Sequence, residues 1–447
     1  PGRCQRGWRS PTAGSRTRFV CESNERNPKK KSPMNESKKV LLFCQHFYPE
    51  MISTGMHMTE LFLALQRIGW AVTVCTAQPS LVLDNKENGV PRHMTYNGVE
   101  IFRVWSIGSH SGGLFKRILF ASSYFLSSMF FLIGNAKKMD GIVFTTNPPF
   151  LGLLGTITKK LFRKRFLYIV YDVYPDILVN LGVISKKGFL HKVLERLSMT
   201  ILANADCNVV IGRDMLEIIR DKVNISRYGR IKLIPNWSDD QMVYPVQEES
   251  NELKKELGAG FDLIVQYSGR MARTHNLEPL VEAADILKEE PILFQFIGDG
   301  AKKKALQKMV AERKLSNVRF FPYQPLEKLN EALSMADVAV VCLEKEFVGL
   351  SVPSKAYGIM AVACPMLGFI DPKSEIGRVI EETGCGVVLS DPTGETVAET
   401  LMDLLKDRSR LKQMGQNGYK EFKQNYTLRI AAGRYSKAMN EIFLECR

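Results

Sequence analysis

The sequence lacks the patterns that mark metal-binding or disulfide-rich chains. Its nine cysteines form no Cys-x-x-Cys pair and have no ligand spacing with the six histidines, so a structural zinc site is not expected. Cys44, Cys75 and Cys342 lie within apolar runs typical of strands. We expect these cysteines to be buried, small hydrophobic residues in a reducing compartment.

No apolar run reaches the length of a membrane span. The segment Leu114–Ile133 is highly apolar, but its uninterrupted part begins at Ile118, contains four serines and falls short of the ~20 residues that a spanning helix needs. Lysine and arginine flank it at Lys116–Arg117 and Lys137–Lys138. A buried helix and a helix that dips into one leaflet both fit this pattern, and a true span fits it less well.

The positive charge is unevenly distributed. Residues 1–33 carry nine Lys/Arg against two Asp/Glu, which is half of the formal net charge of +14. Residues 34–240 carry 25 against 16, and residues 241–447 carry 27 against 29. We interpret residues 1–33 as a disordered, non-native leader ahead of Met34, with a genuine basic tail as the alternative. This stretch contains no apolar core of signal-peptide length.

Four basic clusters lie in the amino-terminal half: Lys137–Lys138, Lys159–Lys160, Arg163–Lys164–Arg165 and Lys186–Lys187. They suit an anionic membrane surface or a phosphorylated acceptor. Ordinary solvated helix faces are the alternative. No recognised nucleic-acid motif accompanies the charge, so nucleic acid is not an expected partner.

Strands and helices alternate along the chain, and 447 residues are enough for two domains of about 200 residues each. In the first half this rhythm predicts a parallel sheet with helices on both faces. The expected strands are Val40–Cys44, Val72–Thr76, Val99–Trp105, Gly141–Thr145, Phe166–Tyr171, Cys207–Ile211 and Ile231–Asn236, with a helix over Met56–Ile68. The polar stretch that follows Trp237 reads as a linker.

Two successive strand–turn–helix units open the second half. Leu263–Tyr267 and Ile292–Ile297 are short apolar runs of the kind that buried parallel strands need. Their turns contain Gly269, Gly298 and Gly300, with Arg270 and Arg273 beside the first glycine. Glycine turns at the carboxyl ends of parallel strands form a crevice that holds anions. A phosphorylated ligand is therefore expected.

Several short motifs lie in order between residues 38 and 443: LLFCQHFYPE with STG, TTNPPFLG, YDVYPDILVNLG, IPNW, YSGRMARTHNLE, FIGDG, ADVAVV and VPSKAYGIMAVACP. With these motifs the chain resembles retaining glycosyltransferases of family 4, in the branch that builds bacterial surface polysaccharides and includes N-acetylfucosamine transferases. The resemblance implies an α/β GT-B fold, with two Rossmann-like domains facing a central cleft. It divides the chain into a leader (1–33), an acceptor-side domain (34–236), a linker (237–248), a nucleotide-sugar domain (249–426) and a final helix (427–447) expected to pack back on the first domain.

Site residues follow from the matched motifs. The resemblance implies Asp172, Arg270 and Lys355 as catalytic residues. It implies donor-binding roles for Gly55, Gly269, Arg273, His275, Gly298, Asp299, Gly300, Tyr323, Pro353 and Ser354. Arg270 would face the leaving phosphate, where negative charge builds. Asp172 would orient the acceptor hydroxyl or act as a base, and capping of the following segment is its competing role.

The chain departs from the family pattern at three positions. His275 stands where the family usually has a lysine, so Arg273 or Lys355 would supply that charge. Leu350 and Gly358 stand where the family has two glutamates, the second of which holds the nucleotide ribose. No Asp-x-Asp signature is present, and the resemblance implies no metal or other cofactor.

The function implied is transfer of a sugar, of N-acetylhexosamine type, from a UDP-sugar to a polyprenyl-diphosphate-linked acceptor in O-antigen, capsule or exopolysaccharide synthesis. The protein would be cytoplasmic and would attach peripherally to the anionic inner face of the membrane. A sugar-nucleotide epimerase or hydrolase of the same architecture is one alternative. A non-catalytic partner protein, suggested by the missing glutamates, is another.

Overall fold

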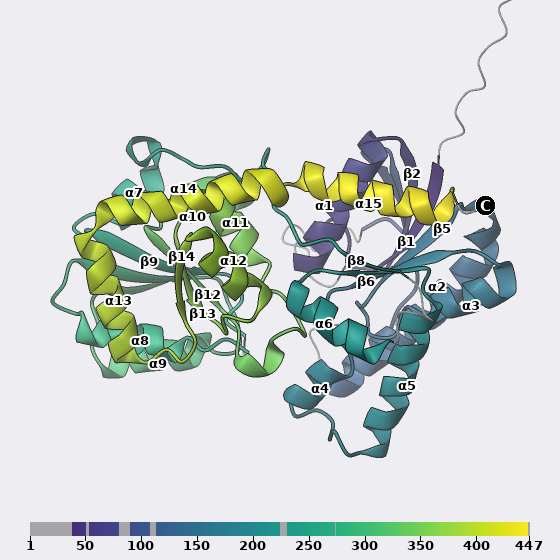
Figure 1. The fold of residues 1–447 in the computed structure, drawn as a ribbon, viewed down its shortest axis with the longest axis horizontal. Helices are drawn as coiled ribbons and strands as arrows, with labels where there is room; N and C mark the ends of the chain where they lie inside the picture. Colours follow the sequence, from purple (N-terminus) through teal and green to yellow (C-terminus); the bar gives the residue numbers. More distant parts are fainter. Residues whose placement is uncertain are drawn as a thin grey trace, which may run out of the picture. The chain divides into compact units, whose positions relative to one another are not determined.

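Two β-sheets, one in each half of the chain, organise this computed structural model (Figure 1). The structure describes residues 38–50, 53–79, 90–107, 113–223, 230–272 and 274–445. Within this part of the chain, residues from both halves belong to one compact unit. The predicted leader at 1–33 lies outside the described residues, so its interpretation stays a prediction.

The first sheet has eight strands in the order β3-β4-β2-β1-β5-β6-β7-β8. Its strands are β1 (Lys38–Phe43), β2 (Trp70–Thr76), β3 (His93–Tyr96), β4 (Val99–Arg103), β5 (Gly141–Thr145), β6 (Phe166–Val170), β7 (Cys207–Val210) and β8 (Arg230–Leu233). Its helices are α1 (Ser53–Arg67), α2 (Leu114–Asn135), α3 (Leu153–Phe162), α4 (Asp176–Asn180), α5 (Phe189–Asn204) and α6 (Arg213–Lys222). Every residue of β5 and β6 is buried, as expected for parallel strands covered on both faces.

One edge of this sheet is antiparallel, so the prediction of a purely parallel sheet is wrong there. Strand β3 pairs antiparallel with β4 through a two-residue turn. Asn97 and Gly98 form that turn with φ values of 48° and 84°. Positive φ at both positions matches the right-handed twist of a hairpin, and Asn-Gly is the preferred sequence for it.

The second sheet has six strands in the order β11-β10-β9-β12-β13-β14, and all of its pairs are parallel. Its strands are β9 (Leu263–Ser268), β10 (Ile292–Ile297), β11 (Val318–Phe321), β12 (Val338–Cys342), β13 (Met366–Phe369) and β14 (Gly386–Leu389). Its helices are α7 (Glu252–Leu257), α8 (Glu278–Ile286), α9 (Lys303–Glu312), α10 (Leu329–Ser334), α11 (Lys355–Ala361), α12 (Glu375–Thr383), α13 (Gly394–Lys406) and α14 (Arg408–Asn425). The strands predicted at 263–267 and 292–297 are confirmed as neighbours.

The last helix, α15 (Leu428–Phe443), lies against the first half of the chain. Trp70 Nε1 donates to Ser436 Oγ at 3.0 Å, and Lys38 Nζ donates to Asn440 Oδ1 at 2.8 Å. Phe443 packs so closely on β5 that a Cβ at Gly141 would lie 2.2 Å from its ring. In Figure 1, α15 runs past α1 and β1, in continuation of α14.

Helix α2 buries three of its hydroxyl-bearing side chains against the first sheet. Tyr124 is fully buried, and its hydroxyl donates to the carbonyl oxygens of Cys44 and Cys75 at 2.9 and 3.0 Å. Ser123 and Ser128 are also buried. The outward side is apolar, with Phe115 78% exposed and Phe130 70% exposed. The stretch Phe115–Lys138 is the one helical segment in the described part of the chain whose length and composition would suffice to cross a membrane, so the prediction that this segment is too short for a span is wrong as to length.

The cysteines in the described residues are all buried, namely Cys44, Cys75, Cys207, Cys342, Cys364 and Cys385. The predicted burial of Cys44, Cys75 and Cys342 is confirmed. Burial raises the pKa of the Cys44 thiol well above its usual range. These thiols therefore behave as small hydrophobic side chains.

Candidate functional site

Two glycine turns at the ends of β9 and β10 pack directly on each other. The Gly269 N–H donates to the carbonyl oxygen of Ile297 at 2.8 Å. A Cβ at Gly298 would lie 2.2 Å from the Gly269 carbonyl oxygen, and a Cβ at Gly300 would lie 2.3 Å from that of Met271. All three glycines also have positive φ, between 130° and 155°. Only glycine allows this approach, because any side chain would push the turns apart.

Lys355, the first residue of α11, points its ammonium group at the first turn. Its Nζ lies 3.6 Å from the centre of the Tyr267 ring, and a Cβ at Gly269 would lie 3.1 Å from Nζ. Nζ is sealed from solvent and makes no hydrogen bond to any residue that the structure describes. Burial lowers the pKa of Lys355 to about 8. A cation is thus held beside the glycine turn without a hydrogen-bond acceptor among the described residues.

His275 braces the same turn without adding charge to it. The Tyr267 hydroxyl donates to the Arg270 carbonyl oxygen at 2.6 Å. His275 Nδ1 lies 2.7 Å from that hydroxyl and 2.9 Å from that oxygen. Burial, followed by repulsion from Lys355, lowers the pKa of His275 to about 3. Lys355, and not His275, therefore carries positive charge beside the turn, while Arg273 lies outside the described residues.

Arg270, Asp299 and Tyr323 surround the outer side of the two turns. Arg270 is exposed, and Tyr323 is 56% exposed. The Tyr323 ring lies 3.3 Å from where a Cβ would stand at Gly298. Asp299 accepts from the Met271 N–H through its backbone oxygen at 2.8 Å. The structure therefore brings these three predicted residues to the same turns as the three glycines.

The first half reaches this region through the start of α1. Ser53 Oγ lies 3.0 Å from Ser354 Oγ, one residue before Lys355. Gly55 sits in the first turn of α1, where a Cβ would lie 3.0 Å from the Glu50 carbonyl oxygen. Pro353 precedes this contact, and its carbonyl oxygen accepts from the Ala356 N–H at 3.3 Å. The predicted residues Gly55, Pro353 and Ser354 thus lie near one junction between the halves.

Asp172 follows β6 and lines a small cavity together with Thr146, Phe150, Tyr174 and Ser198. Burial raises the pKa of Asp172 to about 6. Its backbone N–H donates to Thr146 Oγ1 at 3.3 Å. No hydrogen bond or ion pair joins its carboxyl group to Lys355 or Arg270 within the described chain, so the structure does not bring the three predicted catalytic residues into direct contact.

Sequence reasoning missed the role of Tyr267 and the contact that Ser53, part of the matched STG stretch, makes with Ser354. Tyr267 supplies the ring beneath Lys355, and Ser53 supplies the contact with the second half. The only sequence signal for Tyr267 was an aromatic residue two positions before a glycine turn. At the missing-glutamate positions, Leu350 is 5% exposed and Gly358 has no side chain. Neither position can therefore supply the carboxylate that the family's glutamates provide.

Among the described residues, no group of three or more His, Cys, Asp or Glu side chains is placed to hold a metal ion. The expectation of transfer without a metal stays a prediction.

Two family models together match most of the chain. Residues 54–237 match the glycosyl transferase 4-like domain, and residues 249–421 match the glycosyl transferases group 1. WbjE of Pseudomonas aeruginosa, a glycosyltransferase by name, is 32% identical over 71% of this chain and 78% of its own. The chain belongs to the group 1 glycosyltransferases. WcaI of Escherichia coli, whose name assigns it to colanic acid biosynthesis, is 26% identical over 77% of this chain and 86% of its own.

Solved structures share the fold of this group 1 glycosyltransferase. Sucrose-phosphate synthase of Thermosynechococcus elongatus superposes with a TM-score of 0.74 at 18% identity, over 91% of this chain and 99% of that chain. Anabaena HepE, determined with UDP and glucose, superposes with a TM-score of 0.64 at 14% identity, over 90% and 99%. The GT-B fold expected from the sequence is confirmed.

Proposed function

We propose that this glycosyltransferase transfers an N-acetylhexosamine-type sugar from a UDP-sugar to a polyprenyl-diphosphate-linked acceptor, with retention of the anomeric configuration. The product would be an intermediate of a bacterial surface polysaccharide, such as O-antigen, capsule or exopolysaccharide. The name of WcaI, which places that protein in colanic acid biosynthesis, supports a polysaccharide product. The UDP bound to the GT-B protein HepE supports a uridine nucleotide.

The Lys355 ammonium carries this proposal. It is buried beside the Gly269 turn, and no described residue accepts a hydrogen bond from it. A buried cation without a hydrogen-bonded partner is costly, unless a ligand supplies the acceptor. A diphosphate at the turn would supply acceptor oxygens to Lys355, and the exposed Arg270 could contact the same group. Both cations would then stabilise the charge that develops as the nucleotide leaves.

The transfer itself needs no carboxylate nucleophile. The bond between the sugar C1 and the diphosphate oxygen breaks, and the acceptor hydroxyl oxygen bonds to C1 from the same face. The hydroxyl proton passes to an oxygen of the departing phosphate. Asp172 would orient the hydroxyl or take its proton on the way, and no metal ion is required in this scheme.

Thermal stabilisation by UDP, GDP, ADP and CMP tests the donor site. UDP at ~100 times its dissociation constant should stabilise the protein by roughly 2.7 kcal/mol. Arg270→Ala should lose most of that shift, whereas Arg410→Ala, an equally exposed arginine on α14, should keep it. If no nucleotide produces a shift, the donor proposal fails.

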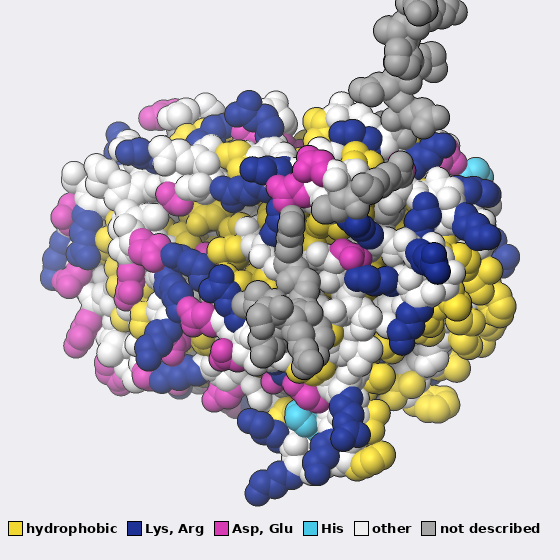
Figure 2. Space-filling view, turned by 45° about the vertical axis from the view of Figure 1, so that its right-hand side comes forward, with side chains coloured by type: hydrophobic (Ala, Val, Ile, Leu, Met, Phe, Trp, Pro, Cys, Tyr) yellow, Lys and Arg dark blue, Asp and Glu magenta, His cyan; other side chains and the backbone are white. Residues whose placement is uncertain are grey.

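The outward side of α2 supports peripheral attachment to a membrane. Its exposed apolar side chains are Phe115, Ile118, Leu119, Leu126, Phe130 and Ile133. Figure 2 shows hydrophobic side chains gathered on the side where α2 and α3 lie in Figure 1. Exposed lysines stand at both ends of the helix, at Lys116 and Lys137–Lys138. Apolar side chains rimmed by cations suit the surface of an anionic leaflet.

Burial of the inner side of α2 favours attachment over spanning. Phe120, Tyr124 and Leu132 are buried along its length, and Tyr124 is hydrogen-bonded to the sheet. A span would require these side chains to leave the core. We therefore propose that the protein is cytoplasmic and that α2 lies along the inner face of the membrane.

Co-sedimentation with anionic phospholipid vesicles tests this attachment. The double variant Phe115→Ser/Phe130→Ser and the charge reversal Lys137→Glu/Lys138→Glu should each reduce the bound fraction. Ile286→Ser, which changes a 53% exposed residue of α8, is the matched control and should leave it unchanged. Equal binding of all four proteins would contradict attachment through α2.

A further inference from the structure

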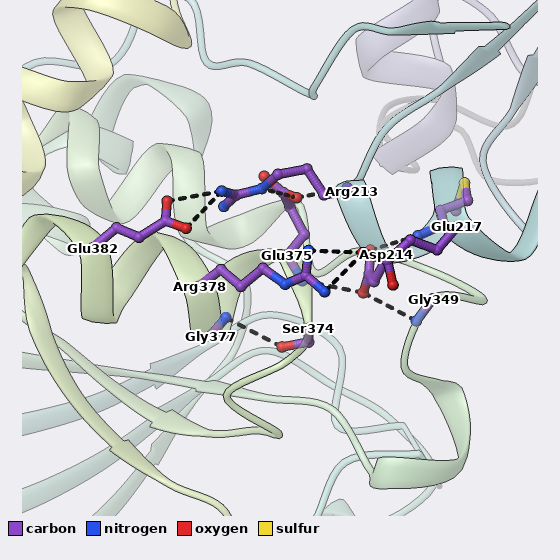
Figure 3. A network of polar contacts seen from close by, with 10 residues as sticks. Arg213, Asp214, Glu217, Gly349, Ser374, Glu375, Gly377, Arg378 and Glu382 are labelled. Atoms are coloured by element: carbon purple, nitrogen blue, oxygen red, sulfur yellow. Dashed lines mark hydrogen bonds and ion pairs between the residues drawn. The ribbon is translucent and has the colours of Figure 1, made fainter.

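Asp214 is the buried centre of a contact between the two halves (Figure 3). It lies in the first turn of α6 and is 5% exposed. Its Oδ2 accepts hydrogen bonds from the backbone N–H groups of Gly349 at 3.0 Å and Glu375 at 3.1 Å, both in the second half. Its Oδ1 accepts from the Met215 N–H at 2.8 Å. One carboxylate therefore holds two separate backbone segments of the other half.

Arg213 reinforces this contact from the same turn of α6. Its backbone N–H and its Nε both donate to Glu375 Oε2, at 2.7 and 2.9 Å. Its Nη1 donates to both carboxylate oxygens of Glu382, at 2.7 and 2.8 Å. Glu375 is 3% exposed, whereas Glu382 lies on the surface. Of the two carboxylates that Arg213 binds, the buried one thus belongs to Glu375, whose backbone N–H also donates to Asp214.

Two glycines make the close approach possible. Gly349 has a φ of +72°, and a Cβ there would lie 2.4 Å from Ile218 Cδ1. A Cβ at Gly212 would lie 2.5 Å from Asp214 Oδ1 and 2.9 Å from Val352 Cγ2. Only backbone without side chains fits at these points. The Gly349 amide can therefore approach the buried Asp214 carboxylate within hydrogen-bond distance.

Gly349, one of the two residues whose N–H groups Asp214 binds, belongs to the stretch 346–354 that leads into Lys355. Among the described residues, the first half makes three further hydrogen bonds to this stretch. Asn180 Nδ2 donates to the Glu346 carbonyl oxygen, and the Val173 N–H donates to the Leu350 carbonyl oxygen at 2.9 Å. The hydroxyls of Ser53 and Ser354 lie 3.0 Å apart. Of these four hydrogen bonds, only the one made by Asp214 uses a charged side chain. The placement of residues 346–354 thus depends on contact with the first half.

We propose that Asp214 is a positioning residue that holds residues 346–354, and with them the Lys355 ammonium, in the arrangement that binds the donor diphosphate. Because Asp214 belongs to the other half, this arrangement is complete only when the halves are in contact. The Lys355 ammonium therefore reaches its diphosphate-binding position only when the two halves make contact. The inference rests on the donor site proposed above and adds to it a residue outside that site.

Hydrogen exchange and UDP affinity together test this role. In Asp214→Ala, the rate of amide exchange of residues 346–354 should rise at least about tenfold, and the dissociation constant of UDP should rise about tenfold. Tenfold is the effect of losing the one hydrogen bond that Asp214 makes to this stretch, the bond to the Gly349 N–H. Asp214→Asn keeps an oxygen acceptor and should restore most of both. Strands β9 and β12 should keep their protection in every variant, which a general loss of stability would not allow.

Glu217→Ala is the matched control, because Glu217 lies on the same helix and also bridges the halves. Its Oε1 accepts from Arg378 at 3.0 Å, but its side chain is 61% exposed, so its loss should change neither measurement. Unchanged exchange of residues 346–354 in Asp214→Ala would overturn the proposal, as would equal loss of protection in β9. If the wild-type protein fails to bind UDP, the donor site is wrong, and the exchange measurement still decides whether Asp214 holds the stretch.

Discussion

The ammonium group of Lys355 lies 3.6 Å from the centre of the Tyr267 ring, with the Gly269 turn beside it. The face of an aromatic ring attracts a cation but offers no hydrogen-bond acceptor of ordinary strength. Tyr267 therefore holds Lys355 in place and leaves its three N–H donors for a ligand. This arrangement explains why a charge remains in a site that lowers the pKa of Lys355 to about 8.

Replacement of Lys355 by methionine should separate stability from binding. Because the pKa of Lys355 falls from 10.5 to about 8 on folding, the unfolded chain binds more protons between these values. The burial cost is fully present below pH 8 and is lost as the pH rises towards 10.5. Without nucleotide, Lys355→Met should melt higher than wild type at pH 7, and this advantage should shrink by pH 9. Calorimetry with and without UDP checks this, since the variant should also lose the UDP shift. A variant that melts lower and still binds UDP would contradict the role of Lys355.

Asp172→Asn should affect turnover and leave donor binding intact. Removal of a proton acceptor or orienting group typically costs ~10²–10⁴-fold in rate, whereas the UDP-binding turns are untouched. Since burial raises the pKa of Asp172 to about 6, wild-type kcat should fall as the pH drops below about 6. Steady-state kinetics over pH, with Asp221→Asn on α6 as control, measures both effects. A normal kcat in Asp172→Asn would assign Asp172 to capping of the next segment.

Glu60 makes the unliganded protein less stable as the pH rises. Burial is the main cause that raises the pKa of Glu60 from 4.5 to about 7, while Trp237 Nε1 donates to Glu60 Oε2 at 3.0 Å. The folded protein therefore binds more protons between pH 4.5 and 7, so the stabilisation is full below pH 4.5 and is lost through pH 7. Glu60→Gln keeps the acceptor and should gain up to about 3 kcal/mol over wild type at pH 8. Urea unfolding at pH 5 and pH 8 checks this, and an equal effect at both values would refute it.

Two glycine-to-alanine changes should have opposite signs. A Cβ at Gly298 would lie 2.2 Å from the Gly269 carbonyl oxygen, at a φ of +130°. Gly298→Ala should therefore destabilise the protein by more than about 1 kcal/mol and weaken UDP binding. Gly433 lies within α15 and has nothing within 4 Å of such a Cβ, so Gly433→Ala should stabilise by about 0.5–1 kcal/mol. Differential scanning calorimetry of both variants gives the signs directly.

The sequence alone determined the alternation of buried strands with helices and the position of the glycine turns. Buried parallel strands are continuous apolar runs, so β5, β6, β9 and β10 could be recognised locally. The glycines at 269, 298 and 300 follow such runs, which placed an anion crevice at the ends of β9 and β10. The antiparallel edge was also present in the sequence, as Asn97-Gly98, but its turn signal was not used.

Only the tertiary structure decided which side chains meet across the fold. Lys355 reaches Tyr267, Ser53 reaches Ser354, and Asp214 reaches Gly349 and Glu375. Each pair is far apart in the chain, and no local periodicity encodes which loops the packing of two sheets brings together. The same holds for α2, since its composition shows an apolar helix but not which side turns outward. That orientation depends on the hydrogen bonds that draw Tyr124 into the core.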